Sequence, residues 1–190
     1  MTDADPFEAF MRNYQDMVFT TAARLLGNAT DAEDIAQEVF LKAHARFPAF
    51  DGIQHVGGWL RRIATNLSLN HLSRYRARWR FFSEMSSGDD EEDFSSRLPA
   101  PETAGAQWNE ADRRALLESA LHKLPAAQRV PLVLYHFEEM SYEEIAEHTG
   151  ASMSKVKTDI HRGREALRRK LQTSLGRELG VYDGTTHEPE

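Results

Sequence analysis

The amino-acid sequence predicts an all-α protein with two small helical domains joined by a flexible acidic linker. Three observations lead to this fold class. Apolar residues recur at steps of three and four along most of the chain, which is typical of helices that bury one face. Residues that begin or end helices separate these segments. Residues 83–105 lose the periodicity and contain five consecutive acidic residues, from Asp89 to Asp93.

The first domain, residues 1–82, is predicted to contain three helices. The first covers residues 6–26 and stops at the glycine that follows. The second opens at Thr30 or Asp31, either of which can cap a helix, and it ends before Pro48. Proline ends it because the residue before a proline disfavours helical geometry.

The third helix of this domain mixes arginine with aromatic residues. After a loop that continues through Gly58, the periodicity predicts a helix over residues 59–82. Arginines interleaved with aromatic rings suit single-stranded or distorted nucleic acid, because cations meet phosphates and bases stack on rings. The alternative is that the rings belong to the core and the arginines are solvated, and the residues leave both open.

A second helical domain is predicted over residues 106–173, with a frayed tail over residues 174–190. Its first helix ends at Pro125, and Pro131 lies inside the apolar run of the next. Because proline removes a backbone donor and crowds the preceding turn, a kink or a later start of that helix is expected.

The stretch from Ser141 onward has the layout of a helix-turn-helix. Ser141 and Glu144 have the spacing of a capping box, and Gly150 lies where the chain must turn. Ser152 or Ser154 then caps a longer, strongly basic helix. A helix-turn-helix places such a second helix in the major groove of DNA, whereas a simple helical hairpin would leave the cations solvated.

Acidic and polar residues form further groups on the helices. Asp34, Gln37 and Glu38 lie opposite the apolar face of the second helix, where they are either solvated or bind a partner. Two acid pairs, Glu138–Glu139 and Glu143–Glu144, lie beside a helix start. We interpret both pairs as structural, because carboxylates stabilise the positive end of a helix.

Positive charge is concentrated in two short stretches of an acidic chain. The net charge of the chain is −7. Residues 51–82, however, contain six arginines against one acidic residue, and residues 153–170 contain seven lysines and arginines against two acidic residues. Phosphate binding depends on such local clusters, because the screening length at physiological salt is only about 8 Å. The sequence therefore predicts two surfaces that bind nucleic acid.

Composition and missing motifs exclude several classes of function. The chain has 190 residues and no cysteine, which excludes disulfides and thiolate metal sites. Neither a phosphate-binding glycine loop nor a serine-nucleophile motif nor a metal-binding histidine pair occurs. We therefore expect no enzyme activity, no metal, no cofactor and no small-molecule substrate. No apolar run approaches the roughly 20 residues that span a bilayer, and the first ten residues do not resemble a signal peptide, so we expect a cytoplasmic protein without membrane insertion.

Taken together, these segments closely resemble the bacterial RNA polymerase sigma factors of the extracytoplasmic function group, the minimal members of the sigma-70 family. The resemblance covers roughly residues 7–172. It is carried, in family order, by FEAFMRNYQDMVFTTAARLLG, DAEDIAQEVFLKAHARF, GGWLRRIATNLSLNHLSR and LPAAQRVPLVLYHFEEMSYEEIAEHTGASMSKVKTDIHRGREALRRKL. It implies a transcription initiation factor that binds core RNA polymerase and directs it to stress- or signal-responsive promoters.

The resemblance implies that the first domain is sigma region 2. Its second helix would bind the clamp helices of the polymerase β′ subunit through Asp34, Gln37 and Glu38. The loop from Phe50 to Gly58 and the helix after it would open the promoter and read the minus-ten element, holding a flipped base in the loop. The residues that match this part are Phe50, Asp51, Gly57, Gly58, Trp59, Arg61, Arg62, Asn66, Arg74 and Arg76.

The second domain would be sigma region 4, whose helix-turn-helix binds the minus-thirty-five element and whose apolar surface receives the flap of the polymerase β subunit. The residues expected to contact this element are Ser152, Ser154, Lys155, Lys157, Thr158, His161, Arg162 and Arg164. The chain departs from the family at Asp159, where an arginine is usual. The carboxylate would remove or repel a phosphate contact, or accept a hydrogen bond from a cytosine amino group.

The resemblance also implies an inhibitory partner, because most relatives are held inactive by an anti-sigma factor. Two other classes of function remain as alternatives. An autonomous helix-turn-helix repressor or activator would bind duplex DNA without polymerase. A purely protein-binding helical adaptor would be indifferent to Asn66→Ala or Arg162→Ala in every DNA-binding assay.

Overall fold

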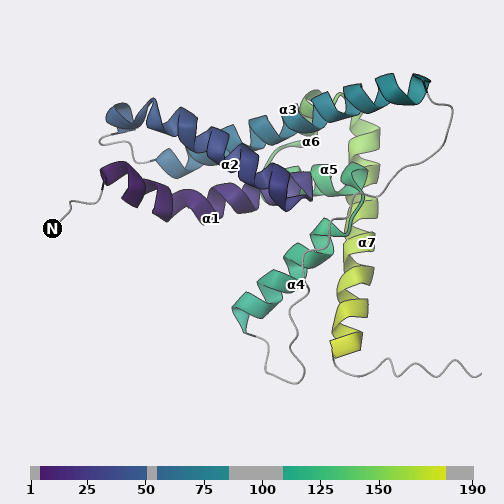
Figure 1. Cartoon of the computed structure of the whole chain (residues 1–190). Helices are drawn as coiled ribbons and strands as arrows, with labels where there is room; N and C mark the ends of the chain where they lie inside the picture. Colours follow the sequence, from purple (N-terminus) through teal and green to yellow (C-terminus); the bar gives the residue numbers. More distant parts are fainter. Residues whose placement is uncertain (1–4, 51–54, 86–108, 179–190) are drawn as a thin grey trace, which may run out of the picture.

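The N-terminal half of the chain forms a bundle of three helices. The computed structural model describes residues 5–50, 55–85 and 109–178, and within these ranges all regular elements are helices, as the sequence predicts. The N-terminal bundle, residues 5–85, contains α1 (Pro6–Leu26), α2 (Ala29–His44), the short 3-10 helix η1 (Phe47–Phe50) and α3 (Val56–Met85). The three long helices run side by side along one another (Figure 1).

The C-terminal half forms a second bundle of shorter helices around one long one. The C-terminal bundle, residues 109–178, contains α4 (Glu110–His122), α5 (Ala126–His136), α6 (Tyr142–Thr149) and α7 (Met153–Glu178). Helices α4, α5 and α6 all pack against α7 (Figure 1). No helix in the described ranges is both long and apolar enough to cross a bilayer.

A glycine and an asparagine separate α1 from α2. Gly27 has a φ of 69°, in the left-handed region that glycine adopts without a steric penalty, and its N–H donates to the last turn of α1. Asn28 caps α2, since its side-chain oxygen accepts from the N–H of Thr30 at 2.9 Å. The predicted start of this helix at Thr30 or Asp31 is therefore wrong, because Asn28 is the first residue in the run that can cap.

The core of the N-terminal bundle lies where the apolar periodicity predicts it. Val18 and Ala22 of α1, Val39 of α2 and Leu60 of α3 are fully buried in one cluster. Half-buried aromatic residues extend this cluster toward the start of α1: Phe7, Phe10, Tyr14, Phe50 and Trp59. Leu25 at the end of α1 is also buried, but it belongs to the core of the C-terminal bundle.

Helix α3 is longer at both ends than the sequence predicts. It begins at Val56, so Gly57 and Gly58 lie in its first turn and not in the predicted loop. Gly57 passes close to α1, because a Cβ atom there would lie 3.2 Å from Cε1 of Tyr14. At the other end, residues 83–85 continue the helix instead of opening the linker, since Glu and Met are good helix formers. The rest of the predicted linker lies outside the described residues.

Capping residues define the first two helices of the C-terminal bundle. Asn109 and Asp112 form a reciprocal capping box at the start of α4, which the sequence analysis missed. Helix α5 begins directly after Pro125 and runs through Pro131, so the predicted later start is wrong. Pro131 is buried in the core between two other apolar residues, and this burial offsets the backbone hydrogen bond that proline cannot donate.

Helix α7 crosses α5 at close range. Val156 and Ile160 of α7 are buried, as predicted, against Leu132 and the rest of the C-terminal core. Gly163 permits the approach, because a Cβ atom there would lie 3.0 Å from the carbonyl oxygen of Gln128. The helix continues to Glu178, so residues 174–178 are helical and do not belong to a frayed tail. Gly176 in this segment costs about 1 kcal/mol of helix stability, and the good helix formers around it outweigh that cost.

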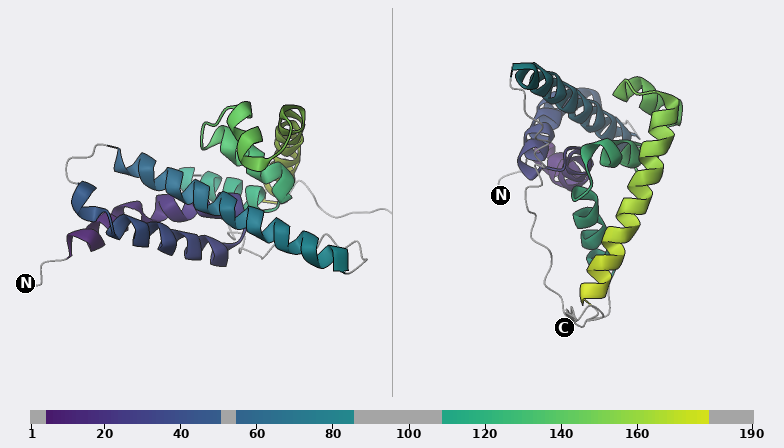
Figure 2. Two further views of the ribbon diagram at one scale, coloured as in Figure 1. Left: turned by 90° about the horizontal axis from the view of Figure 1, so that it is seen from above. Right: turned by 90° about the vertical axis from the view of Figure 1, so that its right-hand side faces the viewer.

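The two bundles touch through the end of α1. The Arg129 guanidinium donates to the carbonyl oxygen of Leu26 in the last turn of α1 at 3.0 Å, and to that of Leu124, between α4 and α5, at 2.7 Å. Arg24 forms a forked ion pair with Glu118 of α4. Seen from two further directions, the C-terminal bundle rests against the side of the N-terminal bundle (Figure 2).

Candidate nucleic-acid interface

The start of α7 is held in place by the turn that precedes it. Ser141 and Glu144 form the predicted capping box of α6, with the serine N–H donating to the glutamate at 2.8 Å. Gly150 ends α6 with a φ of 66°, again as predicted. The Ser152 hydroxyl then accepts from the N–H of Lys155 at 3.3 Å, so Ser152 is the residue that caps α7. The described geometry is that of a helix-turn-helix.

All polar residues predicted to contact the minus-thirty-five element are exposed. They occupy the cap and the first three turns of α7, while Val156 and Ile160 between them face the core. The exposed residues are Ser152, Ser154, Lys155, Lys157, Thr158, His161, Arg162 and Arg164. The structure thus brings the whole set together on one solvent-facing surface, which we call the α7 basic surface.

Aromatic residues from α5 and α6 support the α7 basic surface. Tyr135 and Tyr142 stack with their ring centroids 4.9 Å apart. The Lys157 ammonium lies 5.6 Å from the Tyr142 ring centroid, and the Arg164 guanidinium lies 5.4 Å from that of Tyr135. Sequence reasoning missed this support, because nothing in the spacing of the two tyrosines predicts that they meet under cations from another helix.

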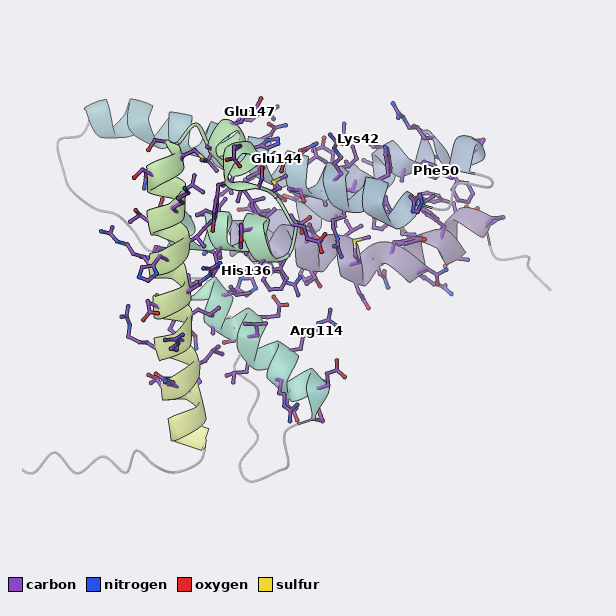
Figure 3. All side chains as sticks on the ribbon, turned by 180° about the vertical axis from the view of Figure 1, so that it is seen from behind. Lys42, Phe50, Arg114, His136, Glu144 and Glu147 are labelled. Carbon is purple, nitrogen blue, oxygen red and sulfur yellow. The ribbon has the colours of Figure 1, made fainter. Side chains whose placement is uncertain are left out.

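His136 fixes Arg164 from a second side. Arg164 Nε donates to His136 Nε2 at 3.0 Å, so this imidazole nitrogen must be unprotonated. Burial lowers the pKa of His136, and the nearby Arg164 charge lowers it further, which keeps the acceptor available at neutral pH. His136, the last residue of α5, thus reaches Arg164 of α7 and is labelled in Figure 3.

Asp159 does not face the solvent beside these cations. It is only 9% exposed, and its carboxylate accepts from the Lys155 ammonium one turn earlier at 2.7 Å. The side chain lies on the inner side of α7, next to the buried Ile160. In this conformation the carboxylate holds Lys155 and is not presented to a base.

The second basic cluster lies on the first half of α3. Arg61, Arg62 and Arg74 are exposed, and Asn66 is half-buried. Trp59 packs against Phe50 with ring centroids 5.1 Å apart. Asp51 lies outside the described residues, and so does the side chain of Arg76. We call the exposed cations and Asn66 the α3 basic surface.

Gly57 and Gly58 have different surroundings at the start of α3. Both are in the first helical turn, and neither has a positive φ. Gly57 is half-buried against Tyr14, whereas nothing lies within 4 Å of the position where a Cβ of Gly58 would be. Space for an approaching ligand therefore exists at Gly58, and Gly57 serves packing between helices.

One acidic residue of the C-terminal bundle contacts α3. The Thr65 hydroxyl donates to Glu138 Oε2 at 3.1 Å, across 73 positions of sequence. Burial raises the pKa of Glu138, while the Thr65 hydrogen bond and the Arg61 charge act in the opposite direction. Glu138 therefore does not stabilise a helix start, as its sequence position suggested, but contacts another helix.

The polar face of α2 is exposed beside an apolar hollow. Asp34, Gln37 and Glu38 are all exposed, and Glu38 pairs with Lys42 at 3.3 Å. Leu41 on the same helix is 72% exposed, which is unusual for a large apolar side chain. It helps to line an open hollow of about 780 Å³ between α1 and α2. This combination of apolar and charged groups suits a protein partner better than a metal, and no cluster of three possible metal ligands occurs in the described residues.

Comparisons with known proteins match both bundles. The model for sigma-70 region 2 matches residues 10–79, and the model for sigma-70 region 4 matches residues 114–167. The chain is 34% identical over 174 residues to the ECF RNA polymerase sigma factor SigW of Bacillus subtilis, covering 90% of this chain and 91% of SigW. It is also 36% identical over 168 residues to the ECF RNA polymerase sigma factor SigE of Mycolicibacterium smegmatis. This second match covers 85% of this chain and 60% of SigE.

A solved structure shares the fold. The chain superposes on the sigma factor RpoE of Bartonella quintana, solved in complex with the anti-sigma factor NepR, with a TM-score of 0.51. The match has 24% identity and covers 89% of this chain and 98% of the other. Because it spans nearly all of both chains, the likeness includes helices from both bundles.

Proposed function

The chain belongs to the extracytoplasmic function group of sigma-70 family RNA polymerase sigma factors, and on this premise we propose that it binds core RNA polymerase and directs it to stress- or signal-responsive promoters. The observation that carries the proposal is the match to both sigma regions in order, together with a curated sigma factor that aligns along almost the whole chain. The polymerase performs the chemistry in the cytoplasm, and the chain itself is not an enzyme.

We assign residues 1–82 to polymerase binding and promoter opening, and residues 106–173 to recognition of duplex DNA. Residues 83–105 join the two parts. This division rests on the two basic surfaces, one on α3 and one on α7, which lie in different bundles. Two separate contacts on one promoter gain affinity when the polymerase holds them at the right spacing.

The polar face of α2 is the proposed polymerase-binding surface. Interfaces usually have an apolar centre and a polar rim. The exposed Leu41 and the hollow beside it would supply the centre, and Asp34, Gln37 and Glu38 would supply the rim. Carboxylates in the rim steer a positively charged partner and raise the rate of association. The proposed partner surface is the clamp of the β′ subunit, and the β flap would contact the C-terminal bundle.

The two basic surfaces are the proposed promoter-binding sites. The α3 basic surface would contact the opened minus-ten strand, since cations of an exposed helix bind phosphates without requiring duplex geometry. The α7 basic surface would enter the major groove at the minus-thirty-five element, with Ser152 and the first turns of α7 against the bases and backbone. We also propose an anti-sigma protein as a partner, as the Bartonella quintana sigma factor has.

Co-elution with core polymerase tests the proposed function directly. We expect the purified chain to co-elute with bacterial core RNA polymerase on size exclusion at low salt, and to support run-off transcription from a subset of a promoter library. Absence of a complex at low salt, with no inhibitor present, would contradict the proposal. Promoter binding that is equally strong with and without polymerase would favour an autonomous helix-turn-helix regulator instead.

A lysine substitution tests the assignment of the α7 basic surface. If Lys157 pairs with a phosphate, Lys157→Ala should weaken promoter binding by the holoenzyme and reduce the slope of log affinity against log salt by about one. Lys123→Ala is the matched control, because Lys123 is an exposed lysine of the same bundle at the end of α4. An unchanged slope for Lys157→Ala would remove Lys157 from the site.

A further inference from the structure

Lys155 and Asp159 form an ion pair within the first turns of α7. The Lys155 ammonium donates to Asp159 Oδ2 at 2.7 Å, one helical turn away. The two side chains differ in exposure, because that of Lys155 is 58% exposed and that of Asp159 is 12% exposed. The cation therefore stands on the surface that would face DNA, while its counterion lies on the inner side of the helix.

Two other cations of the α7 basic surface lie over neutral rings instead. The Lys157 ammonium lies over Tyr142, and the Arg164 guanidinium lies over Tyr135. A neutral ring orients a cation and leaves its charge intact, whereas a carboxylate 2.7 Å from an ammonium cancels most of its attraction for a phosphate. Lys155 therefore adds a dipole to the surface, and Lys157 and Arg164 each add a net positive charge.

The ion pair contributes little to the stability of α7 itself. Lys155 lies in the first turn, and the positive end of a helix disfavours a cation there. A lysine four residues before an acid is also the weaker of the two possible orientations of such a pair. Stabilisation of the helix therefore does not account for the pairing.

The inner position of Asp159 makes the ion pair costly to open. A carboxylate that is largely withdrawn from water requires a hydrogen-bonded cation, because a buried charge without a partner is strongly destabilising. The Lys155 ammonium supplies that cation. If a DNA phosphate paired with the ammonium, Asp159 would lose this donor and would also be repelled by the phosphate. The carboxylate therefore competes with phosphates for Lys155.

We propose that Asp159 is a positioning residue that keeps Lys155 away from DNA phosphates and so weakens the binding of α7 to DNA of any sequence. Phosphate contacts supply essentially all of the sequence-independent affinity of a DNA-binding protein. With one such contact withheld, binding relies more on the second contact that the polymerase would hold at the right spacing. The ion pair is a property of the fold, and its effect on DNA rests on the proposed role of the α7 basic surface.

Asp159→Asn is the central variant, because it keeps the shape of the side chain and removes the charge that holds the ammonium. The probe is a fluorescent duplex of about 30 base pairs with scrambled sequence, titrated with the full chain at several salt concentrations. The variant should bind this duplex several-fold more tightly than the parent at low salt. The slope of log affinity against log salt should steepen by about one, because one more cation displaces a counterion from DNA. An unchanged slope would overturn the proposal.

A matched control separates this effect from a change in net charge. Glu147→Gln removes the same charge from an exposed position of α6, the other helix of the helix-turn-helix. We expect it to leave the slope at the parental value. A slope that steepens equally in Glu147→Gln and Asp159→Asn would reduce the effect to net charge and overturn the proposal. Asp159→Ala also removes the carboxylate and should steepen the slope, so the test survives if the asparagine variant does not fold.

A double variant shows whether Lys155 carries the effect. In the Asp159→Asn background, Lys155→Ala should return the slope to about the parental value. In the parental background, the same substitution should lower the slope by less than half of the loss that Lys157→Ala causes. Equal losses in the parental background would show that Lys155 already binds a phosphate, and would overturn the proposal.

The same set of variants distinguishes this proposal from the proposed function. A normal loss in Lys157→Ala with no change in the Asp159 variants would overturn the role of Asp159 alone. A slope that no variant changes, Lys157→Ala included, would overturn it together with the role of the α7 basic surface.

A second measurement tests whether Asp159 reads a base instead. Run-off transcription by the holoenzyme from promoters with a randomised minus-thirty-five element reports the preference for each base at each position. We expect Asp159→Asn to keep the parental preferences, since the carboxylate acts through Lys155 and not on a base. A loss of preference confined to one position that requires cytosine would assign the carboxylate to a cytosine amino group and overturn the proposal.

Discussion

The two basic surfaces look alike as sequence and differ as structure. The stretches that carry them, residues 51–82 and 153–170, have the same formal excess of positive charge, yet the two surfaces have different surroundings. On α7, the cations lie over tyrosine rings of their own bundle. On α3, the helix that carries Arg61 and Arg62 also contacts the other bundle, where the Thr65 hydroxyl donates to Glu138. A count of charges therefore locates cations but does not tell which of them are available to a phosphate.

The difference follows from where each surface obtains its neighbours. Tyr135 and Tyr142 come from the two helices directly before α7, so the α7 basic surface is complete within one bundle. Glu138 meets Thr65 only because the bundles pack together. Support within a bundle survives separation of the bundles, whereas contacts between bundles are lost. Separation should thus change the α3 basic surface and leave the α7 basic surface unchanged.

The largest effect should come from Arg129→Ala, which removes the guanidinium between the bundles. Its hydrogen bonds to the carbonyl oxygens of Leu26 and Leu124 are buried, and loss of such a charged donor should lower the free energy of unfolding by about 3 kcal/mol. Urea unfolding followed by circular dichroism measures this change. Arg113→Ala, an exposed arginine on α4, is the control. A loss below about 1 kcal/mol for Arg129→Ala would mean that the bundles are held together elsewhere.

A smaller effect is expected from removing the ring under Lys157. Tyr142→Ala deletes one cation–π contact of the α7 basic surface, which is worth about 0.5–1 kcal/mol at an exposed site. Binding of the holoenzyme to promoter DNA should therefore weaken by roughly two- to fivefold. Tyr142→Phe keeps the ring and should bind as the parent does. Equal losses in both variants would assign the effect to the hydroxyl and not to the ring.

The smallest effect should be a pH dependence of stability. Burial raises the pKa of Glu138 in the folded chain above the ordinary value of about 4.5, against the opposing effects of Thr65, Arg61 and Arg24. Folding thus favours the protonated acid, and this contribution is complete below the ordinary value and is lost as pH rises through the raised pKa. The free energy of unfolding, measured with urea at a series of pH values, should fall as pH rises across this window. The difference between the parent and Glu138→Gln isolates the contribution of this carboxyl from that of other acids.

Local signals in the sequence were sufficient where a helix end depends on its own capping residues. Ser141, Glu144 and Gly150 act as predicted, because capping depends on residues a few positions apart. Gly57 and Gly58 were assigned to a loop, but the cost of glycine in a helix is only about 1 kcal/mol, and packing of α3 against Tyr14 outweighs it. Local preference therefore failed where tertiary packing decided the boundary.

For the candidate site, the sequence predicted which side chains are exposed to solvent but not which residues they contact. Polar residues of α7 that alternate with Val156 and Ile160 had to face solvent, and they do. The inward position of Asp159 was missed, since its pairing with Lys155 depends on which side of α7 meets the core. The contact of Glu138 with Thr65 was also missed, because no local pattern links residues 73 positions apart.

The length of α7 has a mechanical consequence. Its 26 residues form one unbroken helix of about 39 Å, so its exposed N-terminal turns and its far end are rigidly connected. Helices α4, α5 and α6 all pack against it (Figure 1). A protein that held the distal turns would therefore also fix the orientation of the cation-bearing end, without ever touching it.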